Sequence, residues 1–204
     1  MFAKVHLPVL DKKLATEQIL NLPNSYSFWD DYRYTKMIPL MTKNGQGSVA
    51  GAINSRDGEF SWVEYAPNTI VDWFENTVFP WMGTRSRIMA LITEPGVSNY
   101  EHIDCDPHQL NTKQHKFRIV LQGTTDTLYF KTSAGDVYAP CIEDAFIMDG
   151  GWPHGMINTG PIPKVTLALG APWTGHDVYN NIDLLMNRLD YEMPEDLSGF
   201  WKKK

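Results

Sequence analysis

The sequence predicts a mainly β domain with flanking helices, and three observations support this fold class. From about residue 85 onward, short apolar or alternating segments are separated by turn residues, without a helical pattern between them. Before this region, residues 68–79 place apolar side chains at helical spacing. After it, an amphipathic helix over about residues 177–190 is indicated by Val178, Ile182, Leu185 and Leu189. Consecutive strands without intervening helices are typical of a sandwich or barrel. We therefore predict a double-stranded β-helix, the jelly roll of cupin-like proteins, with flanking α-helices.

The elements before the β region have weaker signals. Weak alternation over Ala3–Val9 predicts a first strand, and Leu14–Leu22 predicts a short helix. Asn24–Asp31 mixes aromatic and polar residues and is expected to be a loop. The clearest early helix is Asn68–Phe79, with Asn68 and Thr69 able to cap its start and Pro80 expected to end it. Its aromatic stripe is typical of core packing, so we expect this helix on the outside of a sheet.

Five strands are predicted in the β region: Arg87–Thr93, Lys116–Gln122, Thr127–Lys131, Ala145–Met148 and Lys164–Gly170. A turn over residues 123–126 predicts that the second and third of these strands pair as a hairpin. The chain has 204 residues, enough for one domain with a sizeable core. We therefore expect a single domain over residues 1–204, with a β core over about residues 85–175.

The composition excludes some classes of protein. Hydrophobic residues make up 43% of the chain and charged residues 21%, as in ordinary globular domains. A formal net charge of −6 disfavours a broad nucleic-acid surface. The two cysteines, Cys105 and Cys141, form no CxxC pair and no disulfide framework. With no signal peptide and no long apolar run, we expect reduced thiols, a cytoplasmic location and no membrane contact.

The most informative pattern is a histidine and a carboxylate two residues apart, followed by a lone histidine. His102 and Asp104 would point to the same face of an extended strand, and His154 follows about fifty residues later. Alone, a His-x-Asp pair is more often a surface pair than a ligand set. Two histidines and one carboxylate on one face of a metal leave three coordination positions open, as in non-haem iron oxygenases.

A second pattern follows His154 by ten residues. Lys164 begins an alternating segment in which Lys164 and Thr166 share one face. An ammonium and a hydroxyl on one face can hold a carboxylate by charge-assisted hydrogen bonds. By itself, such a lysine would more often be an exposed residue at a strand edge.

Together these residues resemble a known family. Glu94-Pro95-Gly96, His102, Arg118-Ile119-Val120-Leu121, Asp149, His154, Lys164 and Trp173 resemble the aspartyl/asparaginyl β-hydroxylase-like branch of the Fe(II)/2-oxoglutarate-dependent oxygenases. The resemblance covers roughly residues 85–175. Bacterial proline cis-hydroxylases are also in this branch. They are the nearer comparison because the mammalian aspartyl hydroxylases lack the metal carboxylate. Many members have arginine in place of Lys164.

The resemblance implies both cofactors and function. Iron would be bound by His102, Asp104 and His154, and 2-oxoglutarate by Lys164 with help from Arg118. Oxygen and 2-oxoglutarate would take the open positions on iron. The products would be succinate, carbon dioxide and a hydroxylated amino acid, peptide side chain or other small polar substrate. No catalytic residue beyond the metal ligands is required, because the metal does the difficult chemistry.

Three alternatives stay open on sequence grounds. A zinc site could draw on Asp106, His108 and His115, which lie close to the proposed ligands in the chain. A cupin-like metalloenzyme could use a similar fold and ligands without 2-oxoglutarate. A non-catalytic jelly-roll module could use the seven tryptophans as binding platforms. Binding of metal and of 2-oxoglutarate separates these classes.

Overall fold

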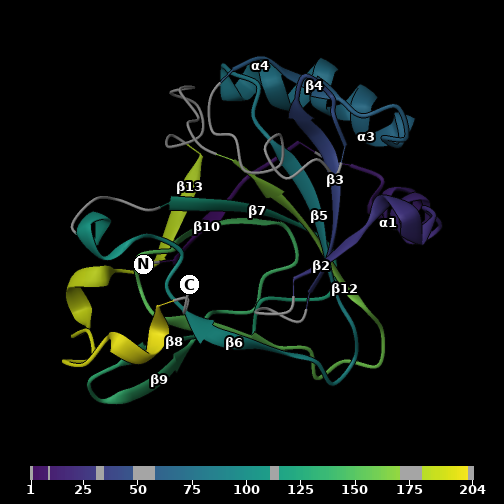
Figure 1. Ribbon diagram of the computed structural model, residues 1–204. Helices are drawn as coiled ribbons and strands as arrows, with labels where there is room; N and C mark the ends of the chain where they lie inside the picture. The colour runs from purple at the N-terminus through teal and green to yellow at the C-terminus, as the bar shows by residue number, and fades with distance from the viewer. Residues whose placement is uncertain are drawn as a thin grey trace.

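The computed structural model describes residues 2–8, 10–30, 35–47, 58–110, 115–170 and 181–201. Among these residues two antiparallel sheets face each other (Figure 1). The larger sheet contains, in order, β13 (Ile182–Met186), β1 (Phe2–Val5), β10 (Ala145–Asp149), β7 (His115–Gln122), β12 (Lys164–Leu169), β5 (Ile88–Thr93), β3 (Thr35–Lys43) and β2 (Phe28–Asp30), with β4 (Phe60–Trp62) paired to β3. The smaller sheet contains β6 (Ser98–His102), β11 (His154–Ile157), β8 (Leu128–Thr132) and β9 (Gly135–Tyr138).

The path of the chain identifies the fold. From β5 to β12 the chain passes repeatedly between the sheets. Strands β5, β7, β10 and β12 lie in the larger sheet, and β6, β8, β9 and β11 lie in the smaller one. Neighbours within each sheet are therefore mostly distant in sequence, as in a jelly roll. The predicted mainly β, double-stranded β-helix fold is confirmed, and the predicted strands of the β region all form.

Alternation along the strands divides the core into two layers. Odd-numbered residues of β7, such as Phe117, face the outer side of the larger sheet. There they pack with α1 (Lys12–Leu20), α3 (Asn68–Trp73) and α4 (Phe79–Met82) (Figure 1). Even-numbered residues such as Val120 face the smaller sheet and pack with Phe130 and Trp152. Because Arg118 shares the face of Val120, it lies between the two sheets. None of the described helices is both long enough and apolar enough to span a membrane.

The helix predicted over Asn68–Phe79 is longer and less regular than expected. It continues from α3 through a π-helical turn, Phe74–Val78, into α4, and Gly83 ends it in the left-handed region at φ 74°. Pro80 lies in the first turn of α4, where its missing N–H is tolerated after the widened π turn. The predicted cap is also wrong, because Pro67 takes the N-cap position and no side chain caps the helix.

The predicted C-terminal helix is wrong. Residues 177–180 lie outside the described residues, and Ile182–Met186 forms β13, which pairs antiparallel with β1. Ile182 packs against the outer core layer and Met186 is buried in the inner one. A few apolar residues at helical spacing were thus overridden by pairing with a strand from the other end of the chain.

Two smaller predictions also need correction. Strand β8 pairs with β9 and β11, not with β7, because the chain crosses to the other sheet after residue 122. The segment predicted as a loop before residue 31 contains a 3-10 turn, Asn24–Tyr26, and the short strand β2. The first strand is shorter than predicted, and Val9 lies outside the described residues. The short helix is confirmed as α1, with Asp11 accepting a cap hydrogen bond from Leu14 N–H at 3.0 Å.

Candidate metal centre

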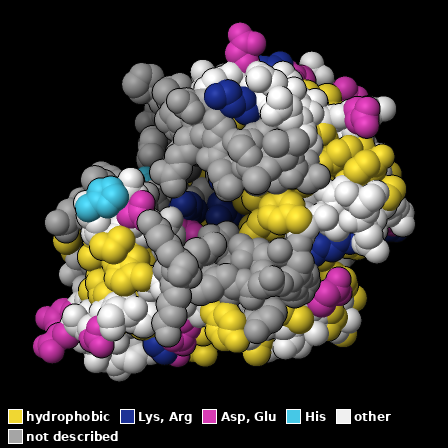
Figure 2. Space-filling view, in the orientation of Figure 1, with side chains coloured by type: hydrophobic (Ala, Val, Ile, Leu, Met, Phe, Trp, Pro, Cys, Tyr) yellow, Lys and Arg dark blue, Asp and Glu magenta, His cyan; other side chains and the backbone are white. Residues whose placement is uncertain are grey.

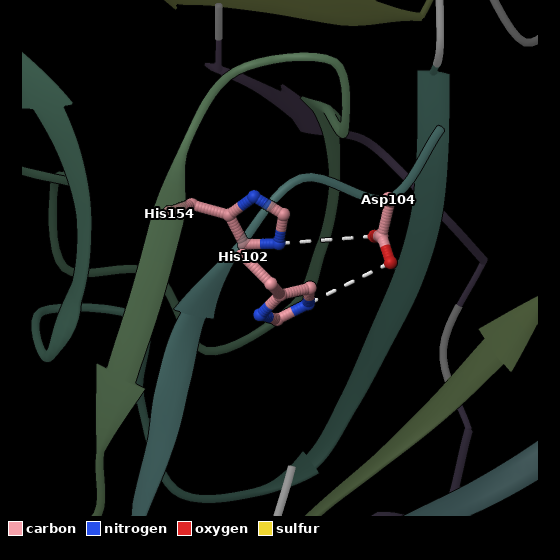
Figure 3. Close-up of side chains that lie close together, drawn as sticks. All are labelled: His102, Asp104 and His154. Atoms are coloured by element: carbon pink, nitrogen blue, oxygen red, sulfur yellow. Dashed lines mark ion pairs between the residues drawn. The ribbon is translucent and has the colours of Figure 1, made fainter. Parts of the chain in front are cut away.

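The structure brings His102, Asp104 and His154 together at one point. His102 ends β6 and His154 begins β11, and the two are cross-strand partners with ring centroids 4.5 Å apart. Asp104 lies just after β6, where its backbone N–H donates to Gly150 O at 2.8 Å. Its Oδ1 is 3.6 Å from His102 Nε2 and its Oδ2 is 3.7 Å from His154 Nε2 (Figure 3). The three candidate ligand atoms all lie within 4.8 Å of one another.

The other ring nitrogens determine which atoms are available. His102 Nδ1 lies 2.7 Å from Tyr100 O, and His154 Nδ1 lies 2.8 Å from Trp152 O. Because a carbonyl only accepts, each Nδ1 must carry the proton and donate it, which directs the Nε2 lone pair toward Asp104. With neutral rings, two nitrogen lone pairs and an anionic carboxylate converge. Such a set of acceptors suits a cation between them, so the donor set fits a divalent metal.

The site is buried rather than superficial. His102 is 4% exposed and His154 is 6% exposed. The Asp104 side chain is 7% exposed. Burial makes a surface-pair interpretation unsuitable, because buried charges are normally paired or bound to metal. Two features of the fold bring the three residues together. One is the register of β6 against β11, and the other is the hydrogen bond between Asp104 N–H and Gly150 O.

A cavity between the sheets is lined by all six residues that were predicted to bind the metal or 2-oxoglutarate. The three candidate ligands line one side, and Arg118, Lys164 and Thr166 line it from the inner face of the larger sheet. The remaining wall is mostly apolar and includes Met37, Leu91, Val120, Leu128, Phe146, Met148 and Met156. Figure 2 shows a hollow on one face of the molecule with Lys or Arg side chains inside it. The cavity therefore combines an apolar wall with a few polar groups, as small-molecule sites do.

Lys164 is a buried cation that lines this cavity. It is 5% exposed, and its Nζ donates to Thr127 Oγ1 at 2.8 Å and lies 3.5 Å from Met156 Sδ. Among the described residues, no carboxylate lies within ion-pair distance of this ammonium. Burial lowers the pKa of Lys164, and the more distant charge of Asp126 opposes this only in part. A buried ammonium without a carboxylate partner is suited to binding an anion.

A turn glycine leaves room for the stem of this lysine. Gly123 has φ +93°, and a Cβ built on it would lie 3.2 Å from Lys164 Cγ and Cε. Any other residue there would be strained in its backbone and would press on the lysine. The glycine therefore serves both the end of β7 and the position of Lys164.

Arg118 and Thr166 lie farther along the same inner face. Thr166 pairs with Val120, and Arg118 pairs with Ala168, which is four residues beyond Lys164 on β12. At strand spacing this places the backbone of Arg118 about 13 Å along the sheet from that of Lys164. Arg118 Nη1 donates to Phe117 O at 3.0 Å. The backbones that carry the two cations therefore lie about 13 Å apart along the sheet.

The residues of the alternative zinc site do not assemble. His108 is exposed on a 3-10 turn, Pro107–Gln109, and Asp106 caps that turn through a capping box with Gln109. His115 begins β7 and pairs with Asp149 of β10. Within the described residues, His102, Asp104 and His154 form the one group arranged to hold a metal. Cys105 is buried, Cys141 is exposed, and both are free thiols.

Several contributors to the site had no signal in the sequence. Thr127 accepts the hydrogen bond from Lys164. Thr35 Oγ1 donates to Asn99 Oδ1 at 2.8 Å and joins β3 to β6 at the cavity wall. These partners are 37 and 64 residues apart in the chain. Only the crossing of the chain between sheets brings them together, so no local pattern could have identified them.

No family model and no curated protein matches this chain. Among solved structures, a prolyl hydroxylase in complex with a hypoxia inducible factor oxygen degradation domain peptide fragment, from Trichoplax adhaerens, is 14% identical with a TM-score of 0.49 over 83% of each chain. A 2OG-Fe(II) oxygenase family oxidoreductase from Burkholderia pseudomallei is 12% identical, with a TM-score of 0.45 over 78% of this chain and 75% of that one. A prolyl-4-hydroxylase from Pseudomonas putida is 12% identical, with a TM-score of 0.45 over 84% of this chain and 92% of that one.

Proposed function

We propose that this chain is an Fe(II)- and 2-oxoglutarate-dependent dioxygenase that hydroxylates an amino acid, a peptide side chain or another small polar molecule. One observation carries the proposal. A buried ammonium, Lys164, shares a cavity with a convergent group of two imidazoles and one carboxylate. A metal centre alone would not need that cation, whereas a metal-chelating dicarboxylate needs both features.

The residues for iron are His102, Asp104 and His154. They supply two nitrogens and one carboxylate from one side, which leaves the other side of the metal open for cosubstrate and oxygen. When bound, iron supplies the redox chemistry. That chemistry would be the oxidative decarboxylation of 2-oxoglutarate by dioxygen to succinate and carbon dioxide, coupled to hydroxylation of the substrate.

Lys164 would bind the far carboxylate of 2-oxoglutarate, with the Thr166 hydroxyl assisting from the same face. The spacing supports this role. Lys164 Nζ is close to Met156, which is two residues along β11 from His154, about 7 Å at strand spacing. Four C–C bonds of ordinary length give the cosubstrate a span of about 5 Å between its end carbons. Such a molecule can reach from the ammonium to a metal held by His154.

Arg118 would act at the other end of the cosubstrate. Its backbone lies opposite Ala168, four residues beyond Lys164 on β12, and this separation along the sheet supports a role away from the far carboxylate. A permanent positive charge there would favour binding of the dianion. The apolar wall of the cavity would exclude water from the reacting atoms, which strengthens these electrostatic interactions.

The residue pattern also favours one branch of the 2-oxoglutarate-dependent oxygenases. The spacing of His102, Asp104, His154 and Lys164 favours the aspartyl/asparaginyl β-hydroxylase-like branch. The carboxylate at Asp104 favours its proline hydroxylases as the nearer comparison. We expect a small molecule or a peptide as substrate, without nucleic acid and without a membrane.

The test combines binding and turnover. Metal-free protein is titrated with Fe(II) and then with 2-oxoglutarate under anaerobic conditions, and succinate release is afterwards followed in air with a library of amino acids and peptides. We expect binding of both and substrate-stimulated succinate release. Binding of metal without 2-oxoglutarate would replace the proposal with a cupin-like metalloenzyme. Binding of neither would replace it with a non-catalytic module.

A further inference from the structure

The turn between β10 and β11, residues 149–153, contacts the proposed metal ligands through its backbone. Gly150 O accepts from the backbone N–H of Asp104 at 2.8 Å. Trp152 O accepts from His154 Nδ1 at 2.8 Å. The position of this turn, which we call the ligand turn, therefore sets both the carboxylate and one imidazole.

The ligand turn is organised around a buried carboxylate. Asp149 is 7% exposed, and its Oδ1 accepts from Gly151 N–H at 3.0 Å. Its Oδ2 accepts from Arg188 Nη1 at 3.0 Å. The Arg188 guanidinium carbon also lies 5.5 Å from the centroid of the Trp152 ring. One arginine therefore pairs with the carboxylate that shapes the turn and covers the aromatic ring whose carbonyl orients His154.

Arg188 belongs to a C-terminal segment, residues 187–201, that contacts the chain on either side of the candidate ligands. After β13 this segment runs beside both ligand-bearing loops. Phe200 O accepts from the backbone N–H of Ile103 at 3.0 Å, and Ile103 lies between His102 and Asp104. The segment itself supplies none of the candidate ligands. These contacts join the last described part of the chain to both segments that carry candidate ligands.

We propose that Arg188 is a positioning residue for the metal centre and acts through Asp149 on the ligand turn. This inference rests on the proposed function, because it assumes that His102, Asp104 and His154 bind a metal. Without the guanidinium, Asp149 keeps a buried negative charge without its arginine partner, and the turn is expected to move toward water. The Gly150 and Trp152 carbonyls would move with it, and the ligands would lose their alignment. Mutation of residues that support metal ligands in this way typically weakens metal binding by roughly 10- to 100-fold.

The experiment measures Ni²⁺ binding to metal-free full chain by calorimetry. Nickel is used because it binds such sites well and is not oxidised in air. Arg188→Met keeps an unbranched apolar stem but removes the guanidinium and its charge, and we expect roughly 10- to 100-fold weaker binding. In Arg188→Lys the charge is kept without the planar fork, so the loss should be smaller.

A matched control lies elsewhere in the molecule. Arg85 makes the same two kinds of contact, an ion pair to Glu75 Oε2 at 2.6 Å and a ring contact with Phe79 at 5.4 Å, but these partners belong to the helix over residues 68–82 and not to the ligand turn. Arg85→Met should leave Ni²⁺ affinity unchanged. Melting temperatures of the metal-free variants show how much each substitution affects folding in general.

A second measurement separates positioning from general stability. In the metal-free wild type, the proton on His154 Nδ1 should exchange slowly with water because it donates to Trp152 O. Arg188→Met should speed this exchange, and Arg85→Met should not. A folded Arg188→Met protein with wild-type Ni²⁺ affinity and wild-type exchange would overturn the inference. If Arg188→Met does not fold, Arg188→Lys decides by the same criteria. A wild type that binds no Ni²⁺ would instead refute the metal centre itself.

Discussion

Lys164 provides the sharpest test of the proposed cosubstrate site. The substitution Lys164→Met keeps a long, unbranched side chain and removes only the ammonium. In the structure this ammonium is almost fully buried and has Thr127 as its hydrogen-bond partner, with no carboxylate in ion-pair range among the described residues. The variant therefore separates charge from packing. Lys164→Ala would remove both.

The expected loss follows from the cost of a buried, unpaired carboxylate. Removing one partner of a buried ion pair typically costs roughly 3–5 kcal/mol. Each tenfold change in affinity corresponds to about 1.4 kcal/mol, so 2-oxoglutarate should bind about 100- to 1,000-fold more weakly. We take the lower part of the energy range because Thr166 and Arg118 remain in the cavity. Lys164→Arg should bind more tightly than Lys164→Met because it keeps the charge.

The stability of the metal-free protein, unlike its affinity for 2-oxoglutarate, should not decrease in Lys164→Met. Burial already lowers the pKa of Lys164, which means that the folded protein disfavours the charged lysine when no anion is bound. Removing the charge should therefore leave the melting temperature of metal-free protein unchanged or raise it. Calorimetric titration of anaerobic, metal-loaded protein with 2-oxoglutarate measures the affinity, and a Ni²⁺ titration serves as the control. Equal 2-oxoglutarate affinity in wild type and Lys164→Met would refute the assignment and would make Arg118 the main anchor.

Three further predictions follow from the site. Asp104→Ala removes the anionic ligand of the group, so Ni²⁺ affinity and succinate release should both fall; full retention of both would exclude Asp104 as a ligand. Because the Lys164 pKa lies below its ordinary value, 2-oxoglutarate affinity should decrease at alkaline pH, by about tenfold per unit above that pKa. Lys164→Arg should remove this pH dependence, and a wild type with constant affinity would contradict the role. Gly155→Ala should destabilise the fold, because its Cβ would lie 2.6 Å from the Tyr129 hydroxyl oxygen; an unchanged melting temperature would show that Tyr129 can move aside.

Local patterns predicted the five strands named in the β region well and the helices less well, while β3, the long strand Thr35–Lys43, was not predicted. Strands such as Lys164–Leu169 show clear alternation, and each falls close to its predicted bounds. The failures occurred where distant contacts outweighed local spacing. Ile182–Met186 has apolar residues that could serve a helix, but β1 offers unpaired backbone groups beside it, and pairing satisfies both strands. The π turn before Pro80 is a similar case, because it accommodates a proline that would otherwise end the helix.

In the candidate site, too, some relations follow from local spacing and others from contacts between distant parts of the chain. A two-residue spacing keeps His102 and Asp104 close in the chain, and the alternation of β12 makes Lys164 and Thr166 share a face. These relations follow from backbone geometry alone, so a sequence is sufficient to state them. The predicted roles of these residues as metal and cosubstrate ligands stay predictions until binding is measured.

The sequence by itself determined which residues could act together: the strand pattern of the jelly roll, the two short-range pairs, and the presence of a second histidine and a second cation. The tertiary structure decided that they do meet. It set His154 opposite His102 and joined Asp104 to Gly150 by a backbone hydrogen bond. It also buried Lys164 with no carboxylate in ion-pair range among the described residues, and it paired Arg188 with Asp149 in the turn before His154. The physical reason is that strand register and crossings between sheets are chosen by the burial of many side chains at once, so they cannot be read from the spacing of any few residues.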